Sequence, residues 1–224
     1  MMENTLQRAI QTALPAFGKV SGRDVTDIQV TLLTIINSDK PFMQKVEELD
    51  EVFDDEPTLE ALREVFFDLL LINFFSEDVN KLEEDYLDSP EWEAIEDKTI
   101  DRGTELLNVL LYLKECEDER IEPELGDFLK EFLLVDEDEF QDEHRIYEDI
   151  IANQILVESN FAEIARVANE LPATSEIKEL FYSLMCFFNE ANPSEKQKEL
   201  FLANAPEPEL DIFVYTLLTS YINK

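Results

Sequence analysis

Glycine is scarce in this sequence, with only four residues among 224. Glycine supplies the backbone conformations that tight hairpins and phosphate-binding loops require, so its scarcity disfavours β-rich architectures and Gly-rich nucleotide loops. The sequence also contains no Walker loop and no Gly-x-Ser-x-Gly, Gly-x-Gly-x-x-Gly or Cys-x-x-Cys motif. We therefore expect a protein without catalytic residues, metal ligands or cofactors.

Histidine and cysteine are almost as rare as glycine. The single histidine, His144, excludes zinc sites built from several histidines, and we expect it to be a surface side chain paired with acids. The two cysteines, Cys116 and Cys186, lie far apart in the sequence, each beside apolar positions of a helical pattern. This placement predicts reduced, buried thiols.

No stretch of the sequence is apolar for long enough to cross a bilayer. The most apolar segment, residues 65–75, is interrupted by Asp68 and Asn73. The first residues lack the basic stretch followed by an apolar run that marks a secretory signal. These observations predict a cytoplasmic protein that does not bind membranes.

Basic residues are few, 18 against 53 acidic ones, and the formal net charge is −35. Because a nucleic-acid backbone is bound by clusters of Lys and Arg, direct nucleic-acid binding is not expected. The charge is localised: residues 46–149 hold 38 acids and 8 bases, whereas residues 1–45 carry a net +1 and residues 150–224 a net −6. A solvated surface or adaptation to high salt could explain an acidic protein, but the localisation favours a field directed at a basic partner.

Hydrophobic residues make up 45% of the chain and include 16 Phe, which is enough for an ordered core. They recur at spacings of three and four residues, as expected for amphipathic helices. Ser89-Pro90 and Asn192-Pro193 each predict a helix start, with a capping side chain before a proline. The pattern predicts an all-α fold without a sheet and about twelve helices, at 3–17, 24–37, 42–53, 58–75, 79–87, 90–114, 118–133, 139–157, 161–170, 175–190, 194–203 and 206–223.

The chain also resembles itself at an offset of 115 residues, where residues 1–91 align with 116–206 without a gap. Pro57 aligns with Pro172, Phe66 with Phe181 and Leu69 with Leu184. The alignment predicts a tandem duplication of a six-helix module, arranged as a helical repeat or as two packed bundles, with modules at 1–115 and 116–224. The alternative is a chance match between two amphipathic helical stretches.

In bulk properties the sequence is similar to acidic immunity proteins or antitoxins and to nucleic-acid mimics, although no motif carries the resemblance. We therefore expect a non-enzymatic protein that binds, and by covering its surface can inhibit, a basic protein such as a nucleic-acid-binding enzyme or a toxin. One alternative is a helical-repeat adaptor that binds peptides and whose charge only keeps it soluble; another is a helical enzyme with a carboxylate-bound metal. The residues expected to bind the partner are Glu83, Glu84, Asp85, Trp92, Glu117, Asp118, Glu119, Asp136, Glu137, Asp138, Glu139, Asp142 and Glu143.

Overall fold

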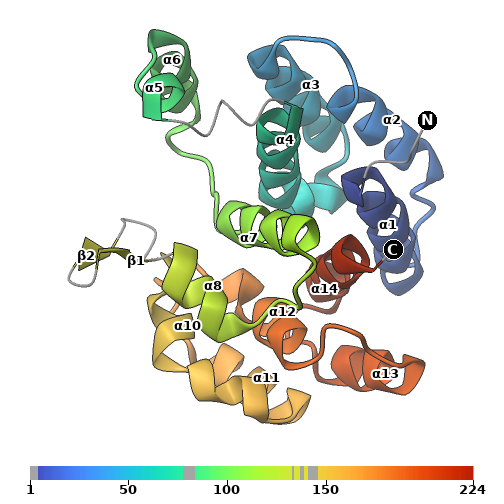
Figure 1. Ribbon diagram of the computed structural model, residues 1–224. Coiled ribbons are helices and arrows are strands. Elements are labelled where there is room, and N and C mark those ends of the chain that lie inside the picture. The colour runs from blue at the N-terminus through green and yellow to red at the C-terminus, as the bar shows by residue number, and fades with distance from the viewer. Residues whose placement is uncertain (1–4, 78–83, 133, 137–138, 141–145, 224) are drawn as a thin grey trace. The chain divides into compact units, whose positions relative to one another are not determined.

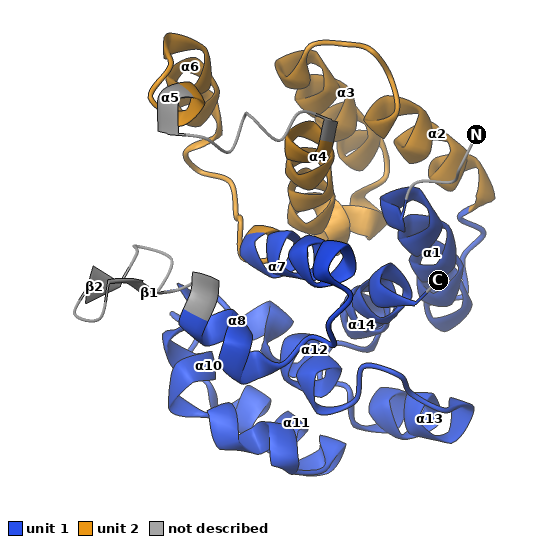
Figure 2. Cartoon of the chain, viewed as in Figure 1, with its two compact units in different colours: residues 1–25, 108–224 blue, residues 26–107 orange. Residues whose placement is uncertain are grey.

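The computed structural model describes residues 5–77, 84–132, 134–136, 139–140 and 146–223, and it confirms the predicted all-α fold (Figure 1). These residues divide into two compact units, one made of residues 1–25 and 108–224 and the other of residues 26–107 (Figure 2). Each unit is described by itself below.

The unit of residues 26–107 is built around α4 (Arg63–Glu77), in which every residue from 65 to 73 is buried. α3 (Phe42–Asp55) packs against α4, α2 (Thr26–Ile36) packs against α3, and the short 3-10 helix η1 (Pro57–Leu62) contacts both α3 and α4. α5 (Glu84–Leu87) and α6 (Pro90–Thr99) follow and contact each other. The ring centroids of Phe53 on α3 and Phe66 on α4 lie 5.8 Å apart. Aromatic packing therefore holds α3 to α4.

The unit of residues 1–25 and 108–224 is centred on α12 (Lys178–Asn189) and α14 (Pro208–Ile222), which pack against each other. Its N-terminal helix, α1 (Thr5–Ser21), packs along α14, so the first and last helices of the chain are neighbours. α1 ends where Gly22 adopts a φ of 71°, a left-handed conformation that glycine takes without strain. The remaining elements are α7 (Leu107–Glu119), α8 (Leu125–Phe132), β1 (Leu134–Asp136), β2 (Glu139–Phe140), α10 (Glu148–Ala152), η3 (Gln154–Glu158), α11 (Phe161–Glu170) and α13 (Glu195–Asn204).

Three predicted helices are wrong. The helix predicted at 118–133 begins only at Leu125, because residues 120–124 form the loop after α7. The helix predicted at 139–157 is replaced by β2, α10 and η3, and β2 pairs with β1 in a short antiparallel hairpin that the prediction of no sheet excluded. The helix predicted at 90–114 is two helices, because the chain between α6 and α7 is held by carboxylates of α4. Glu64 accepts a hydrogen bond from the backbone N–H of Gly103 at 3.0 Å, and Asp68 accepts one from that of Leu106 at 2.9 Å. The N–H groups of Gly103 and Leu106 thus bond to side chains of α4 and not to carbonyl oxygens of a continuous helix.

One of the two predicted caps is confirmed. Ser89 caps α6, since its hydroxyl accepts a hydrogen bond from the backbone N–H of Trp92 at 3.2 Å. The cap predicted at Asn192 is wrong, because α13 begins after Ser194, whose side chain forms a capping box with Gln197. In this capping box the backbone N–H groups of Ser194 and Gln197 each donate to the other residue's side chain, so two donors at the start of α13 are satisfied.

The compact units cut the chain after Val25 and after Leu107, whereas the predicted modules meet at 115/116. Part of the predicted correspondence is nevertheless visible: α3 ends at Asp55 and α11 at Glu170, and α4 begins at Arg63 and α12 at Lys178, both 115 residues apart. The aligned apolar residues are buried in both segments, since Phe66, Leu69, Phe181 and Leu184 are each 0% exposed. The tandem duplication itself stays a prediction.

Candidate functional site

The predicted partner-binding residues fall into a described and an undescribed group. The side chains of Glu83, Glu84, Asp85, Asp136, Glu137, Asp138, Glu139, Asp142 and Glu143 lie outside the described residues, as does His144. The described group is Glu117, Asp118 and Glu119 at the end of α7, and Trp92 on α6. Of these four residues, Glu117, Asp118 and Glu119 belong to a dense run of acids that the structure describes.

This run, residues 115–127, covers the end of α7, the loop that follows and the start of α8, and we call it the acidic turn. It holds seven acidic residues and one basic residue, Arg120. Six of the seven acids are exposed; the seventh, Glu117, is half-buried and accepts a hydrogen bond of 3.1 Å from the Thr5 hydroxyl of α1. The acidic turn therefore concentrates negative charge on the surface of its unit.

The backbone of the acidic turn is fixed at both ends. Arg120 adopts a left-handed φ of 60°, and the backbone N–H of Ile121 donates to the carbonyl oxygen of Cys116 at 3.0 Å, which closes α7. Glu124, four residues after Arg120, is held by the Tyr112 hydroxyl of α7. This hydroxyl accepts a hydrogen bond from the N–H of Glu124 at 2.9 Å and donates one to the carbonyl oxygen of Glu124 at 3.1 Å. Burial raises the pKa of the Tyr112 hydroxyl, so this group stays protonated and able to donate at physiological pH.

Replacing Tyr112 with phenylalanine is expected to loosen the acidic turn and to cost about 1–2 kcal/mol. The N–H of Glu124 loses its partner, and its carbonyl oxygen keeps only the hydrogen bond from the N–H of Phe128 at 3.1 Å. Hydrogen exchange at the Glu124 amide measures the effect directly, and its protection should fall towards that of an exposed loop. As a control, Tyr215→Phe removes the hydroxyl that donates to the Glu190 carbonyl oxygen at 2.8 Å and should leave the Glu124 amide unchanged. Full protection of Glu124 in Tyr112→Phe would contradict this role.

Five of the seven acids of the acidic turn lack a basic partner in the described part of the chain. Within the described residues, Asp118, Glu119, Glu122, Glu124 and Asp127 make no ion pair with a basic side chain. Ile121 lies among them and is 46% exposed. An apolar side chain surrounded by acids is the arrangement expected of a contact that a basic partner would bury.

The acids of the other unit are arranged differently. Arg63 contacts the carboxylates of Asp50 at 3.2 Å, Asp54 at 2.7 Å and Glu60 at 2.9 Å, and these partners raise the pKa of its guanidinium. Arg102 contacts Asp50 at 2.9 Å. Three of the seven acids in residues 47–56 are thus paired within their own unit, namely Asp50, Asp54 and Glu48, the last with Lys40.

Trp92 is packed against other aromatic residues of its unit. Its ring is stacked on Phe74 at a centroid distance of 6.4 Å and lies 5.3 Å from Phe75 and 6.2 Å from Tyr86. The ring is half-buried. The structure therefore shows a packing role for Trp92, and a contact with a partner stays a prediction.

The reactive groups that sequence reasoning singled out are buried. Cys116 and Cys186 are free and buried, as predicted, and burial raises the pKa of the Cys186 thiol. Among the described residues no group of three or more His, Cys, Asp or Glu is placed to hold a metal ion. No helix in the described ranges is long and apolar enough to cross a membrane.

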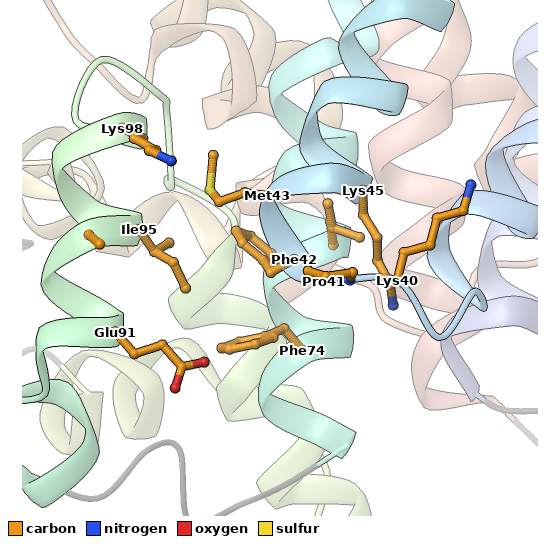
Figure 3. A pocket seen from close by; sticks show the side chains of 11 residues that line it. Lys40, Pro41, Phe42, Met43, Lys45, Phe74, Glu91, Ile95 and Lys98 are labelled. Atoms are coloured by element: carbon orange, nitrogen blue, oxygen red, sulfur yellow. The ribbon is translucent and has the colours of Figure 1, made fainter.

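The structure also contains a feature that sequence reasoning missed, a pocket between α6 and the pair α3 and α4 (Figure 3). Its residues come from positions 40–45, 70–74 and 91–98, and no sequence motif links these segments. The only sign of this pocket in the sequence is the presence of basic residues within an acidic segment.

No family model, curated protein or solved structure matches this chain.

Proposed function

We propose that this chain is a non-enzymatic acidic binding module that binds, and can thereby inhibit, a basic-surfaced protein through the acidic turn. The observation that carries the proposal is the combination of exposed, unneutralised acids with the exposed Ile121 on a backbone fixed by Tyr112. Long-range attraction would speed the encounter, and burial of Ile121 would supply part of the affinity.

The rigidity of the acidic turn matters for this function. A surface held in its bound conformation loses less conformational entropy on association than a mobile loop does. Tyr112 provides this restraint from a position at which its ring is 1% exposed, so the restraint does not depend on the partner. α7 thus has two roles: its last turn carries acids, and its Tyr112 holds the loop that follows.

The test is charge reversal in the acidic turn. Changing Glu119, Glu122 and Glu124 to Lys should slow association with the basic partner about tenfold or more at low ionic strength. The difference should shrink as the Debye length falls towards about 3 Å near 1 M salt. The partner is first captured from native cell extract on the immobilised wild-type chain, eluted with salt and identified, and association rates are then measured by stopped flow with the purified protein.

The control is the triple variant Glu158, Glu176 and Glu199 to Lys, which makes the same change in net charge at exposed acids outside the acidic turn. It should change association much less. A second variant, Ile121→Ser, should leave the association rate nearly unchanged and speed dissociation, because it removes an anchor and not a charge. Equal slowing by both triple variants, or salt-independent binding, would contradict the proposal and favour the peptide-binding adaptor whose charge only keeps it soluble.

A further inference from the structure

The pocket between α6 and the pair α3 and α4 lies entirely within the unit of residues 26–107 and has a volume of about 400 Å³. This volume is in the range of sites that hold small organic ligands. Figure 3 shows Phe42 and Phe74 facing Ile95 of α6 across it. Apolar side chains form most of its wall, namely Phe42, Met43, Leu70, Phe74, Ala94 and Ile95.

The charged residues around the pocket are unusual for this chain. Residues 26–107 contain 24 acids and only six bases. Three of those six bases, Lys40, Lys45 and Lys98, line the pocket, against a single acid, Glu91. Half of the positive charge of a strongly acidic segment thus surrounds one apolar cavity.

The three lysines differ in what they contact. Lys40 is paired with Glu48 at 2.5 Å, and the buried Lys45 donates to the carbonyl oxygen of Ile36 at 3.0 Å. Lys98 is exposed, and within the described residues it forms no ion pair. It lies two helical turns from Glu91, so the two mark opposite ends of the α6 wall, whereas Lys40 and Lys45 lie on the side of α3 (Figure 3). Since Lys40 and Lys45 are already engaged, Lys98 is the lysine of this pocket able to take a negative charge.

We propose that this pocket binds a small amphiphilic anion, such as a medium-chain carboxylate. Its apolar tail would lie between α6 and the pair α3 and α4, and its anionic head would lie beside Lys98. The tail gains affinity because it leaves water for an apolar wall, and the head gains it from the ammonium group. A cationic amphiphile would be repelled by Lys98, and a neutral one would gain nothing from its charge. This inference is independent of the binding function proposed for the acidic turn, because its pocket lies in the other unit.

The chain contains its own probe for this binding. Trp92 is the only tryptophan, and its ring is stacked on Phe74, which lines the pocket. Titration of the full chain with decanoate, below its micelle concentration, should change the tryptophan fluorescence with saturation. Within the series from hexanoate to decanoate, each added methylene should tighten binding up to about fourfold until the tail outgrows the pocket. Decanol should bind more weakly than decanoate, and decylammonium more weakly still.

Two variants locate the site. Lys98→Met keeps an apolar stem but removes the charge, so it should weaken decanoate binding about tenfold and leave decanol binding unchanged. Ala94→Phe places a ring in the pocket from an exposed position of α6 and should abolish the binding of both ligands. Lys196→Met, at an exposed lysine of α13, is the matched control and should behave as the wild type.

Several results would overturn the proposal. One is the absence of a saturable fluorescence change with decanoate up to millimolar concentration. Another is decylammonium binding as tightly as decanoate, which would show that the lysines do not select the ligand. Decanoate binding that survives Ala94→Phe would place the ligand elsewhere on the chain. An equal loss of decanoate affinity in Lys98→Met and Lys196→Met would show that the net charge of the chain, and not Lys98, determines binding.

Discussion

Truncating Phe181 to alanine is expected to lower the free energy of unfolding by about 3–5 kcal/mol. The ring is 0% exposed on α12, the helix that packs against α11, η3 and α14, so the substitution leaves a cavity in the centre of its unit. Phe66→Ala should have a similar effect in the other unit, where the ring packs against Phe53. Urea titrations of both variants, followed by far-UV circular dichroism, measure these losses.

The control for these truncations is Leu200→Ala on α13, where the side chain is 49% exposed. A substitution on the surface removes little buried area, so its cost should stay within about 0.5 kcal/mol. A loss below about 1 kcal/mol for either phenylalanine would mean that the surrounding helices collapse into the cavity or do not form the core.

The sequence predicts the helices of this chain best where local pattern and tertiary contacts agree. α11 begins and ends where the pattern of apolar residues places it, and the structure adds a cap, since the Asn160 side chain accepts a hydrogen bond from the N–H of Glu163 at 3.0 Å. The break between α6 and α7 could not be found in this way. It depends on hydrogen bonds from Gly103 and Leu106 to carboxylates about 40 residues earlier, and helical periodicity continues across the gap.

Two residues that are 115 positions apart, Asp68 and Ser183, both make buried polar contacts. Asp68 lies on α4 and Ser183 on α12, and both are buried. Asp68 accepts from the N–H of Leu106 just before α7, and Ser183 donates to the carboxylate of Asp211 in the first turn of α14 at 2.7 Å. In each case the buried helix makes a polar contact with the start of a later helix. The partners, Leu106 and Asp211, are 105 and not 115 residues apart, so the parallel does not establish a duplication, which stays a prediction.

The candidate site was only partly predictable. Composition identified Glu117, Asp118 and Glu119 as a dense acidic run, because charge density can be counted in a sequence. The hydrogen bonds by which the Tyr112 hydroxyl fixes the loop, and the ion pairs of Asp50 and Asp54 with Arg63 and Arg102, depend on contacts between segments far apart in the sequence. Such contacts decide which acids remain available to a partner, and no local pattern records them.

The stability of this protein is expected to fall as the pH rises from about 4 to 7, in part because of Asp211. Its carboxyl is 1% exposed, and burial raises its pKa from 3.8 to about 6 despite hydrogen bonds from the Ser183 hydroxyl and the N–H of Glu207. Between these two pKa values the folded chain binds the proton more tightly than the unfolded chain. The stabilising contribution is complete below about pH 4 and is lost as the pH passes 6, a change of about 3 kcal/mol. Burial also raises the pKa of Asp68 well above its usual range, which adds a loss of the same sign.

The variant Asp211→Asn distinguishes the contribution of Asp211 to this pH dependence from that of the repulsion among the 53 acids. This repulsion also lowers stability as carboxyl groups ionise. The amide keeps one oxygen for the N–H of Glu207 and offers a donor to the Ser183 hydroxyl, so the buried network can persist without a titrating group. Relative to the wild type, the variant should therefore gain about 3 kcal/mol of stability between pH 4 and pH 7, measured by urea titration at each pH. Glu209→Gln removes an exposed carboxyl from the same helix and should show little of this gain. If both variants changed alike with pH, the surface charge and not the buried carboxyl would set the pH dependence.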